Sequence, residues 1–285
     1  MPRLTSWLTR TPVHLALITL SLLWTLPSLG LLISSIRPPA DVLSTGWWTV
    51  FQHPFEFTQY SLENYRAVLG AAGMGQALLN SFTIAIPATV IPIAIAAFAA
   101  YALAWMEFPG RQWLFLAIVA LLVVPLQMTF IPLLRAYRDL GLTGTFTGVW
   151  LAHTGYSLPL GIYLLCNYIR ALPGDLIEAA AMDGATHIQI FTRVVVPLSM
   201  PAIASFAVFQ FLWVWNDLLI ALVFLGGTPT VAPLTITLTN LVGSRGQDWH
   251  LLTAGAFITM TVPLLVFFAL QRYFVRGLLA GSVKG

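Results

Sequence analysis

Residues 77–106 read A-L-L-N-S-F-T-I-A-I-P-A-T-V-I-P-I-A-I-A-A-F-A-A-Y-A-L-A-W-M and contain no Asp, Glu, Lys or Arg. A helix rises about 1.5 Å per residue, so about 20 apolar residues cross the hydrocarbon layer of a bilayer, which is roughly 30 Å thick. The whole chain has this character, because 58% of its 285 residues are hydrophobic and 8% are charged. A soluble domain carries about 25% charged residues, and a disordered chain carries few apolar ones. The composition excludes both classes and predicts a membrane protein.

Five other stretches are apolar over a comparable length, which predicts an all-α, polytopic membrane protein with six transmembrane helices. The predicted spans cover residues 13–36, 77–106, 112–134, 148–168, 198–225 and 251–273. The first is longer than the apolar segment of a secretory signal peptide and no A-x-A cleavage site follows it, so we expect it to be retained.

We expect three parts of the chain. Residues 1–76 form the first span and an external segment, residues 77–273 form a core of five spans with a cytoplasmic loop at 169–197, and residues 274–285 form a cytoplasmic tail. Lys and Arg collect on the cytoplasmic side of membrane proteins, and the side shared by the two termini holds eight of the 13 basic residues. We therefore expect both termini in the cytoplasm. The net charge of +3 comes with no basic stripe, so no nucleic-acid partner is expected.

Several kinds of chemical site are missing from the sequence. A nucleotide-binding P-loop needs a Lys followed by Ser or Thr, whereas the only lysine, Lys284, precedes Gly285. The five histidines are not spaced as metal ligands and Cys166 is the only cysteine, so neither a metal site nor a catalytic site is predicted. Ion-coupled carriers place several ionisable groups inside the membrane, and Asp217 is the only acid away from the predicted span ends. These absences favour a transporter driven by a partner protein and a neutral polar substrate.

The cytoplasmic loop contains the sequence P-G-D-L-I-E-A-A-A-M-D-G-A-T at residues 173–186. This pattern predicts a helix over 175–182, a reversal at Gly184, and a second helix over 188–196 that lies across the membrane face and ends before Pro197. Small alanines beside acidic and apolar residues suit a helix that docks into a groove of another protein. A helix that rests on lipid headgroups usually carries Lys and Arg, whereas the charges of this loop sum to −1. Docking onto a protein is therefore favoured.

The same loop resembles the EAA loop of ABC importer permeases, E-A-A-x3-G-x9-I-x-L-P. The matching residues are Glu178, Ala179, Ala180, Gly184, Val194, Val196 and Pro197, with valines at the Ile and Leu positions. Asn80-Ser81, Pro125-Leu-Gln127 and Trp215-Asn-Asp217 are similar to the carbohydrate branch of that family. The resemblance covers nearly the whole chain.

This resemblance implies a type-1 ABC importer transmembrane domain, similar to the smaller permease of the maltose-type importer, in a bacterial or archaeal cytoplasmic (inner) membrane. It implies a second related permease, two ATPase subunits that bind ATP and Mg²⁺, an extracytoplasmic solute-binding protein, and no cofactor in this chain. By this resemblance the tail and the external loop 226–249 contact the ATPases and the binding protein respectively. The residues expected to couple to the ATPases are Glu178, Ala179, Ala180, Asp183, Gly184 and Pro197. The segment 30–48 suggests an α-glucoside or oligosaccharide as the substrate.

The predicted fifth span carries candidates for the substrate path. Gln210, Trp213 and Asp217 share one helix face at i, i+3 and i+7, and Asn216 lies beside them. Aromatic platforms next to amide or carboxylate groups suit sugars. Structural hydrogen bonding inside a helix bundle explains the same residues equally well, and it is the favoured role for Gln127 and Asn80. His153 and Cys166 are interpreted as packing residues.

Three other functions remain open. An ion-coupled secondary carrier for a neutral polar solute would need no ATPase. An intramembrane enzyme would need a paired acid, base or metal constellation within the spans. A lipid-facing scaffold would not need the E-A-A-x3-G spacing.

Overall fold

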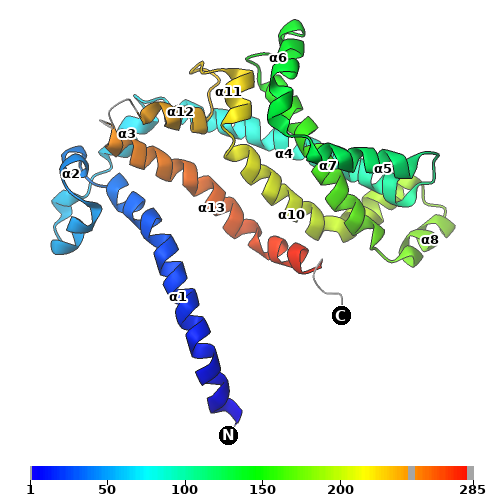
Figure 1. Cartoon of the computed structure of the whole chain (residues 1–285), viewed down its shortest axis with the longest axis horizontal. Coiled ribbons are helices and arrows are strands. Elements are labelled where there is room, and N and C mark those ends of the chain that lie inside the picture. Colours follow the sequence, from blue (N-terminus) through cyan, green and yellow to red (C-terminus); the bar gives the residue numbers. More distant parts are fainter. Residues whose placement is uncertain (1, 243–247, 281–285) are drawn as a thin grey trace. The chain divides into compact units, whose positions relative to one another are not determined.

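The computed structural model describes residues 2–242 and 248–280. Within these ranges the chain is helical and has no β-strand (Figure 1), which confirms the predicted all-α class. The α-helices are α1 (Pro2–Ser35), α2 (Pro39–Ser44), α3 (Glu63–Leu69), α4 (Met74–Trp105), α5 (Arg111–Ala120), α6 (Phe130–Asp139), α7 (Phe146–Arg170), α8 (Gly174–Met182), α9 (His187–Ile190), α10 (Val196–Trp215), α11 (Leu219–Leu225), α12 (Leu234–Leu241) and α13 (Trp249–Ala280). Between them lie the 3-10 turns η1 (Trp47–Gln52), η2 (Phe57–Gln59), η3 (Leu121–Val123) and η4 (Leu126–Thr129), and the π-turn η5 (Phe191–Val195).

Within the described ranges, four helical stretches are long and apolar enough to cross a membrane: Thr11–Ser35, Met74–Trp105, His187–Trp215 and Trp249–Gln271. They coincide with the first, second, fifth and sixth predicted spans. α7 occupies the fourth predicted span with 25 residues. The total of six stays a prediction, because the third predicted span has a different form.

The third predicted span, 112–134, is not one straight helix. Two helical stretches, Arg111–Val123 and Leu126–Asp139, meet at an angle of 95°, which is the geometry of a broken span or of a re-entrant loop. Val124 at the bend is extended, with φ −75° and ψ 117°. The physical reason is Pro125, whose ring disfavours the helical conformation of the residue before it and which offers no N–H to continue the helix.

The fifth predicted span begins earlier and ends earlier than the predicted 198–225. Helical structure runs without a break from His187 to Trp215, so the expected separate helix over 188–196 is wrong. The continuity passes through the π-turn η5, which ends at Val195, two residues before Pro197. We attribute the π-turn to this proline, because proline supplies no N–H and is tolerated in the first turn of the helix that follows. After Trp215 the chain breaks and resumes as α11.

The chain forms two compact units, residues 1–75 with 237–260, and residues 76–236 with 261–285. The predicted division at residues 76 and 273 stays a prediction. Of the predicted tail 274–285, the part up to Ala280 is helical and residues 281–285 lie outside the described residues. Residues 243–247, within the predicted binding-protein loop, also lie outside them.

In the first unit, a buried arginine joins the segment after α1 to the end of that helix. Arg37 is 4% exposed, and its guanidinium donates to the Gly46 carbonyl at 3.1 Å and to the Thr45 hydroxyl at 2.6 Å. Asn64 in α3 donates to the carbonyls of Ser35 and Arg37, at 3.2 and 2.7 Å. These bonds satisfy backbone groups where α1 ends and give the segment a defined conformation.

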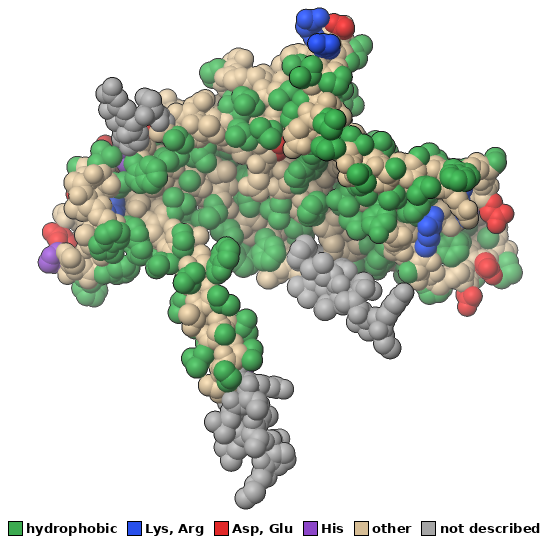
Figure 2. All heavy atoms as spheres, viewed as in Figure 1, with side chains coloured by type: hydrophobic (Ala, Val, Ile, Leu, Met, Phe, Trp, Pro, Cys, Tyr) green, Lys and Arg blue, Asp and Glu red, His purple; other side chains and the backbone are tan. Residues whose placement is uncertain are grey.

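In the second unit, α7 packs against α5, α10 and α11. Close packing depends on Gly161 of α7, where an added Cβ would lie 2.7 Å from the ring of Phe206 in α10. Trp150 of α7 also donates to the Thr83 carbonyl of α4 at 2.9 Å. In this unit Figure 2 shows acidic side chains around α8 and charged side chains at the tip of α6, with hydrophobic and uncharged atoms over much of the face between them. This separation of charge suits a protein whose middle lies in hydrocarbon.

Candidate functional site

The coupling loop, residues 169–197, connects α7 to α10 and contains α8 and α9. α8 begins after Pro173, which disrupts the preceding helix, and Asp175 places a negative charge in its first turn. A carboxylate at this position stabilises a helix because the first N–H groups carry partial positive charge. The helix begins at Gly174, one residue before the predicted start, and ends at the predicted residue, Met182.

α8 ends in a Schellman motif. The Ala185 N–H donates to the Ala180 carbonyl and the Gly184 N–H donates to the Ala181 carbonyl, at 3.1 and 3.0 Å. This pattern needs a left-handed residue after the helix, and the φ of Gly184 is +79°. The glycine of the EAA sequence is therefore required by the backbone geometry of the loop.

A capping box then begins α9. The Thr186 hydroxyl accepts from the Gln189 N–H at 3.3 Å, and the Gln189 side chain accepts from the Thr186 N–H at 2.8 Å. Each side chain thus satisfies a backbone donor that the first helical turn leaves free. Both ends of the reversal between α8 and α9 are set by residues within the loop itself.

The outward face of α8 combines acidic and apolar groups. Its exposed residues include Asp175, Leu176, Glu178, Ala179 and Met182. Met182 is 84% exposed and Leu176 is 45% exposed. Asp183, Gly184 and Pro197 are exposed as well, whereas Ala180 is half-buried. Ile177, an apolar residue of the same helix, is 8% exposed and packs inward. α8 therefore offers a partner a small-residue surface edged by carboxylates.

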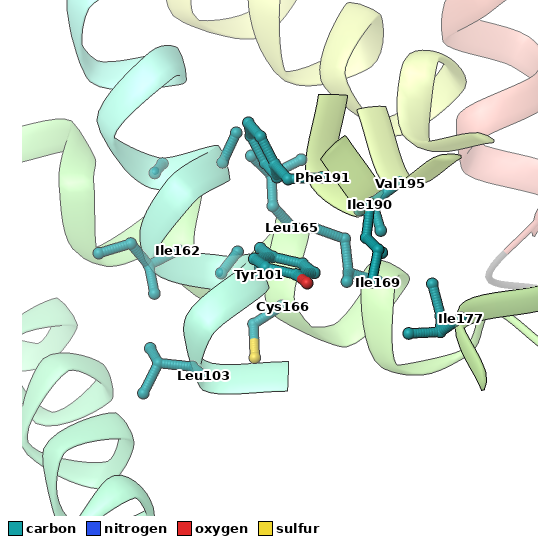
Figure 3. Packing of buried hydrophobic residues seen from close by; sticks show 13 residues of the cluster. Tyr101, Leu103, Ile162, Leu165, Cys166, Ile169, Ile177, Ile190, Phe191 and Val195 are labelled. Carbon is teal, nitrogen blue, oxygen red and sulfur yellow. The ribbon is translucent and has the colours of Figure 1, made fainter. Parts of the chain in front are cut away.

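The inward side of the loop belongs to a buried hydrophobic cluster, which we call the anchoring cluster. Its members are Ala96, Ala97, Ala100, Tyr101, Leu103, Ile162, Leu165, Cys166, Ile169, Ile177, Ile190, Phe191 and Val195. Figure 3 shows side chains from α4, α7, α8 and α9 meeting here, with the Tyr101 ring in their midst. Burial of this apolar surface joins the loop to the long helices α4 and α7.

Polar contacts reinforce the start of the coupling loop. The Trp105 indole N–H donates to the Ile169 carbonyl at 3.2 Å, and the Arg170 guanidinium donates to the Leu103 carbonyl at 3.2 Å. The same guanidinium lies 4.6 Å from the ring centre of Phe115 in α5, within range of a cation–π contact. The ends of α4 and α7 and the start of α5 are therefore linked where the loop begins.

Three of the predicted substrate-path residues lie apart from one another. Gln210 is 1% exposed and donates to the Ala88 carbonyl at 3.0 Å. Asn80 is 3% exposed and donates to the carbonyls of Thr230 and Ala232, both at 3.0 Å. These bonds match the structural role weighed for both residues. Gln127 is exposed in η4, beside the sharp bend.

Asp217 lies at the break between α10 and α11. Its carboxylate accepts from the N–H groups of Ile220 at 3.3 Å and Ala221 at 2.9 Å, and thereby caps α11. The Thr235 hydroxyl donates to the Asp217 carbonyl at 2.7 Å. Asn216, the neighbouring candidate, is exposed and donates to the Leu212 carbonyl of its own helix at 2.8 Å. The side chains of Asp217 and Asn216 therefore bond to different helices, α11 and α10 respectively.

His153 of α7 joins Trp213 and Asp217. Its Nε2 lies 3.9 Å from an Asp217 carboxylate oxygen, and its ring meets the Trp213 ring edge to face at 5.2 Å. The imidazole is 1% exposed, and neither ring nitrogen has a hydrogen-bond partner. A small cavity beside it is lined by Ser81, Ile84, His153, Val214, Trp215, Asp217, Ala221 and Pro233. Its volume of about 10 Å³ is near the least that holds one water molecule.

Sequence reasoning interpreted His153 as a packing residue and did not predict that its side chain lies beside Trp213 and Asp217. The available signal was its position, because an ionisable side chain within an apolar span is costly and is usually functional. Its sequence neighbours gave no pairing, and the acid that it approaches lies 64 residues later in the chain.

Residues 92–279 match the family described as "Binding-protein-dependent transport system inner membrane component". The chain is 73% identical to the osmoprotective compounds uptake permease protein GgtD of Synechocystis sp., over 99% of this chain and 95% of that protein. It is 45% identical to the alpha-glucoside transport system permease protein AglG of Rhizobium meliloti, over 96% of this chain and 97% of that protein.

A solved structure of a bacterial ABC transporter involved in the import of the acidic polysaccharide alginate superposes with a TM-score of 0.78. It covers 94% of this chain and 98% of the matched chain at 21% identity, so this likeness concerns the fold. It confirms the transmembrane fold of an ABC importer. The family match spans the coupling loop and the α10–α11 break, and the chain belongs to the family of inner membrane components of binding-protein-dependent transport systems.

Proposed function

We propose that this chain forms half of the translocation pore of an ATP-driven importer and couples ATP hydrolysis to the passage of a neutral glycosidic solute. The observation that carries the proposal is α8, an exposed acidic helix that is joined through the anchoring cluster to α4 and α7. A subunit that has no P-loop lysine receives the work of hydrolysis by contact with a partner. In the proposal, two ATPase subunits bind ATP and Mg²⁺, and this chain is not hydrolytic.

The exposed side chains of α8 define the contact with the ATPases. Glu178 and Asp175 supply carboxylates for basic groups of a groove, and Ala179 allows close approach of its walls. Met182, a flexible apolar side chain, fills irregular space. Movement of a docked α8 shifts the equilibrium between inward-open and outward-open states, because α8 packs through the anchoring cluster against α4 and α7.

The orientation and the other partners follow from the same arrangement. α8 lies on the cytoplasmic side in this proposal, as do both termini. A second related permease supplies the other half of the pore. An extracytoplasmic solute-binding protein delivers the solute to the opposite face, where residues 226–249 are proposed to meet it.

A neutral glycoside is the proposed cargo. Support comes from relatives named for osmoprotective compounds and alpha-glucosides. Trp213, which offers an aromatic face, and Asp217, which offers an acceptor, are the proposed solute contacts. The cavity beside Asp217 is too small for a sugar ring, so it must widen in another state of the transport cycle.

The test is a charge reversal on α8. In proteoliposomes that contain the full transporter with its ATPase subunits, partner permease and binding protein, we expect Glu178→Lys to abolish import of radiolabelled trehalose, a neutral α-glucoside. The protein should still insert and purify normally, because Glu178 is exposed and packs in no core. Glu107→Lys is the matched control, since Glu107 is also an exposed acid, in the connection between α4 and α5.

Two outcomes contradict the proposal. Normal ATP-driven import by the Glu178→Lys protein would remove the coupling role. Import by this chain alone, driven by an ion gradient without any ATPase, would establish the ion-coupled carrier instead.

A further inference from the structure

A single long-range hydrogen bond joins the far side of the coupling loop to α4. The Tyr101 hydroxyl of α4 lies 3.0 Å from Nδ1 of His187, the first residue of α9. Eighty-six residues separate the two in sequence. Tyr101 is 5% exposed and His187 is exposed, so the bond lies where the anchoring cluster meets the aqueous edge of the loop.

The surroundings of this bond hold both groups in place. The Tyr101 ring meets the Phe191 ring at 5.5 Å, and Phe191 also stacks on Phe98 at 4.4 Å. The capping box of Thr186 and Gln189 fixes the first turn of α9 and with it the position of His187. A buried tyrosine hydroxyl that lost its partner would be left desolvated without a hydrogen bond, which is costly.

α4 therefore contacts both arms of the loop. Near its end, Leu103 and Trp105 are bonded to Arg170 and Ile169, where the loop leaves α7. One turn earlier, Tyr101 is bonded to His187, where the loop returns toward α10. Between these two attachments α8 projects with its exposed face free.

The returning arm also contains the π-turn, Phe191–Val195, directly after α9. A π-turn carries one residue more than an α-helical turn accommodates and commonly marks a functional position. Without the Tyr101 bond, the returning arm would be held to α4 by apolar contacts alone, which are not directional.

We propose that Tyr101 is a positioning residue for coupling: its bond to His187 makes α4 move with the loop, so that displacement of α8 by an ATPase reaches the transmembrane helices. The proposal rests on the proposed function. Tyr101 touches neither nucleotide nor solute, and loss of its hydroxyl makes the transporter slip, so that ATP is hydrolysed with less solute imported.

The measured quantity is the amount of trehalose imported per ATP hydrolysed, in proteoliposomes of the complete transporter. Tyr101→Phe keeps the ring packing and removes the hydroxyl, and we expect this ratio to fall about two- to tenfold, the factor that corresponds to one hydrogen bond. ATPase activity should stay near that of the unaltered protein. His187→Ala should lower the ratio equally, and the double variant should be no worse than either single one, because both remove the same bond.

A conservative variant and a matched control separate coupling from general stability. His187→Asn offers an amide group near the position of Nδ1 and should restore the ratio. Tyr156→Phe removes another tyrosine hydroxyl, which bonds to the Thr129 hydroxyl at 2.7 Å, and should leave the ratio unchanged.

The inference is overturned if Tyr101→Phe and His187→Ala keep the full ratio, or if Tyr156→Phe lowers it as much as they do. Glu178→Lys, measured in the same vesicles, distinguishes the two ideas. If it abolishes import while the Tyr101 variants stay fully coupled, α8 docks as proposed and only the role of Tyr101 is wrong. If it has no effect, the proposed function itself fails.

Discussion

The coupling loop and the α10–α11 break carry the two halves of the proposed activity, and they are built in opposite ways. The loop is held by a continuous apolar cluster, a Schellman motif and a capping box, with its polar residues outside. At the break, Asp217 serves as a helix cap while His153, 1% exposed, has no hydrogen-bond partner for either nitrogen. A part that transmits movement has to be stiff. A part that admits solute keeps polar groups which water or cargo can satisfy in another state.

The largest effect is expected from Gly184, because the stiffness of the loop depends on its left-handed backbone. Gly184→Ala adds a Cβ at φ +79° and should destabilise the end of α8 by about 1–2 kcal/mol, with a large loss of coupled transport. Thermal unfolding in detergent and transport in vesicles measure the two consequences.

Gly155→Ala is the matched control for that variant. Gly155 lies in helix α7, and apart from its neighbours in the chain and the backbone of its own helix, no atom lies within 4 Å of the position that a Cβ would take. Alanine should therefore be tolerated there, or should stabilise the helix by about 0.5–1 kcal/mol. Equal stability and transport of the Gly184→Ala and Gly155→Ala proteins would show that the loop does not need its left-handed glycine. The coupling loop would then not be the stiffer of the two regions.

An intermediate effect is expected from Asp217, where two substitutions separate capping from solute contact. Asp217→Ala should lower stability by about 1 kcal/mol, since it removes the acceptor of the Ile220 and Ala221 N–H groups. Asp217→Asn should retain most of that stability, because asparagine caps helices about as well as aspartate.

The transport assay then decides the role of the carboxylate. If Asp217 contacts the solute through its charge, Asp217→Asn should raise the KM for trehalose while the ATP coupling ratio stays intact. A KM equal to that of the unaltered protein would assign Asp217 to capping alone.

The smallest effect on stability is expected at His153. His153→Leu replaces an imidazole whose nitrogens are buried without partners by an apolar side chain, so stability should stay within about 0.5 kcal/mol or rise. Transport should nevertheless fall if the cavity belongs to the solute path. If the variant transports normally, His153 has only a packing role, and its closeness to Trp213 and Asp217 has no part in solute transport.

Sequence signals predicted α8 and the reversal after it well, because the structure of this part depends on neighbours in the chain, whereas the separate helix expected over 188–196 was wrong. Pro173, Asp175 and Gly184 bound α8 within one residue of the structure. The break was harder, since the role of Asp217 depends on helices α7 and α12 as well as on α11. Periodicity placed Gln210, Trp213 and Asp217 on one face, yet it could not show that Gln210 is bonded to α4.

Prolines mark the other differences between expectation and structure. Pro125 bends the third predicted span by 95°, whereas Pro197 leaves a continuous helix. Both residues lack an N–H, so local chemistry alone does not separate the outcomes. What differs is position: Pro197 is the second residue of α10, where a missing N–H costs no helical bond, whereas Pro125 falls in the middle of the predicted span 112–134. The anchoring cluster also buries Val195 shortly before Pro197, while Val124 is exposed.

The buried Arg37 has a consequence for how the protein is made. The hydrogen-bond partners described for Arg37 and Asn64 all lie within residues 35–49. The Ser35 hydroxyl lies 2.7 Å from the hydroxyl of Tyr65, so the whole network is contained in residues 35–65. This network can close as soon as the first stretch of chain has left the ribosome, before the pore helices are synthesised. The nascent protein would then possess a folded segment directly after α1 before the rest of the chain is made.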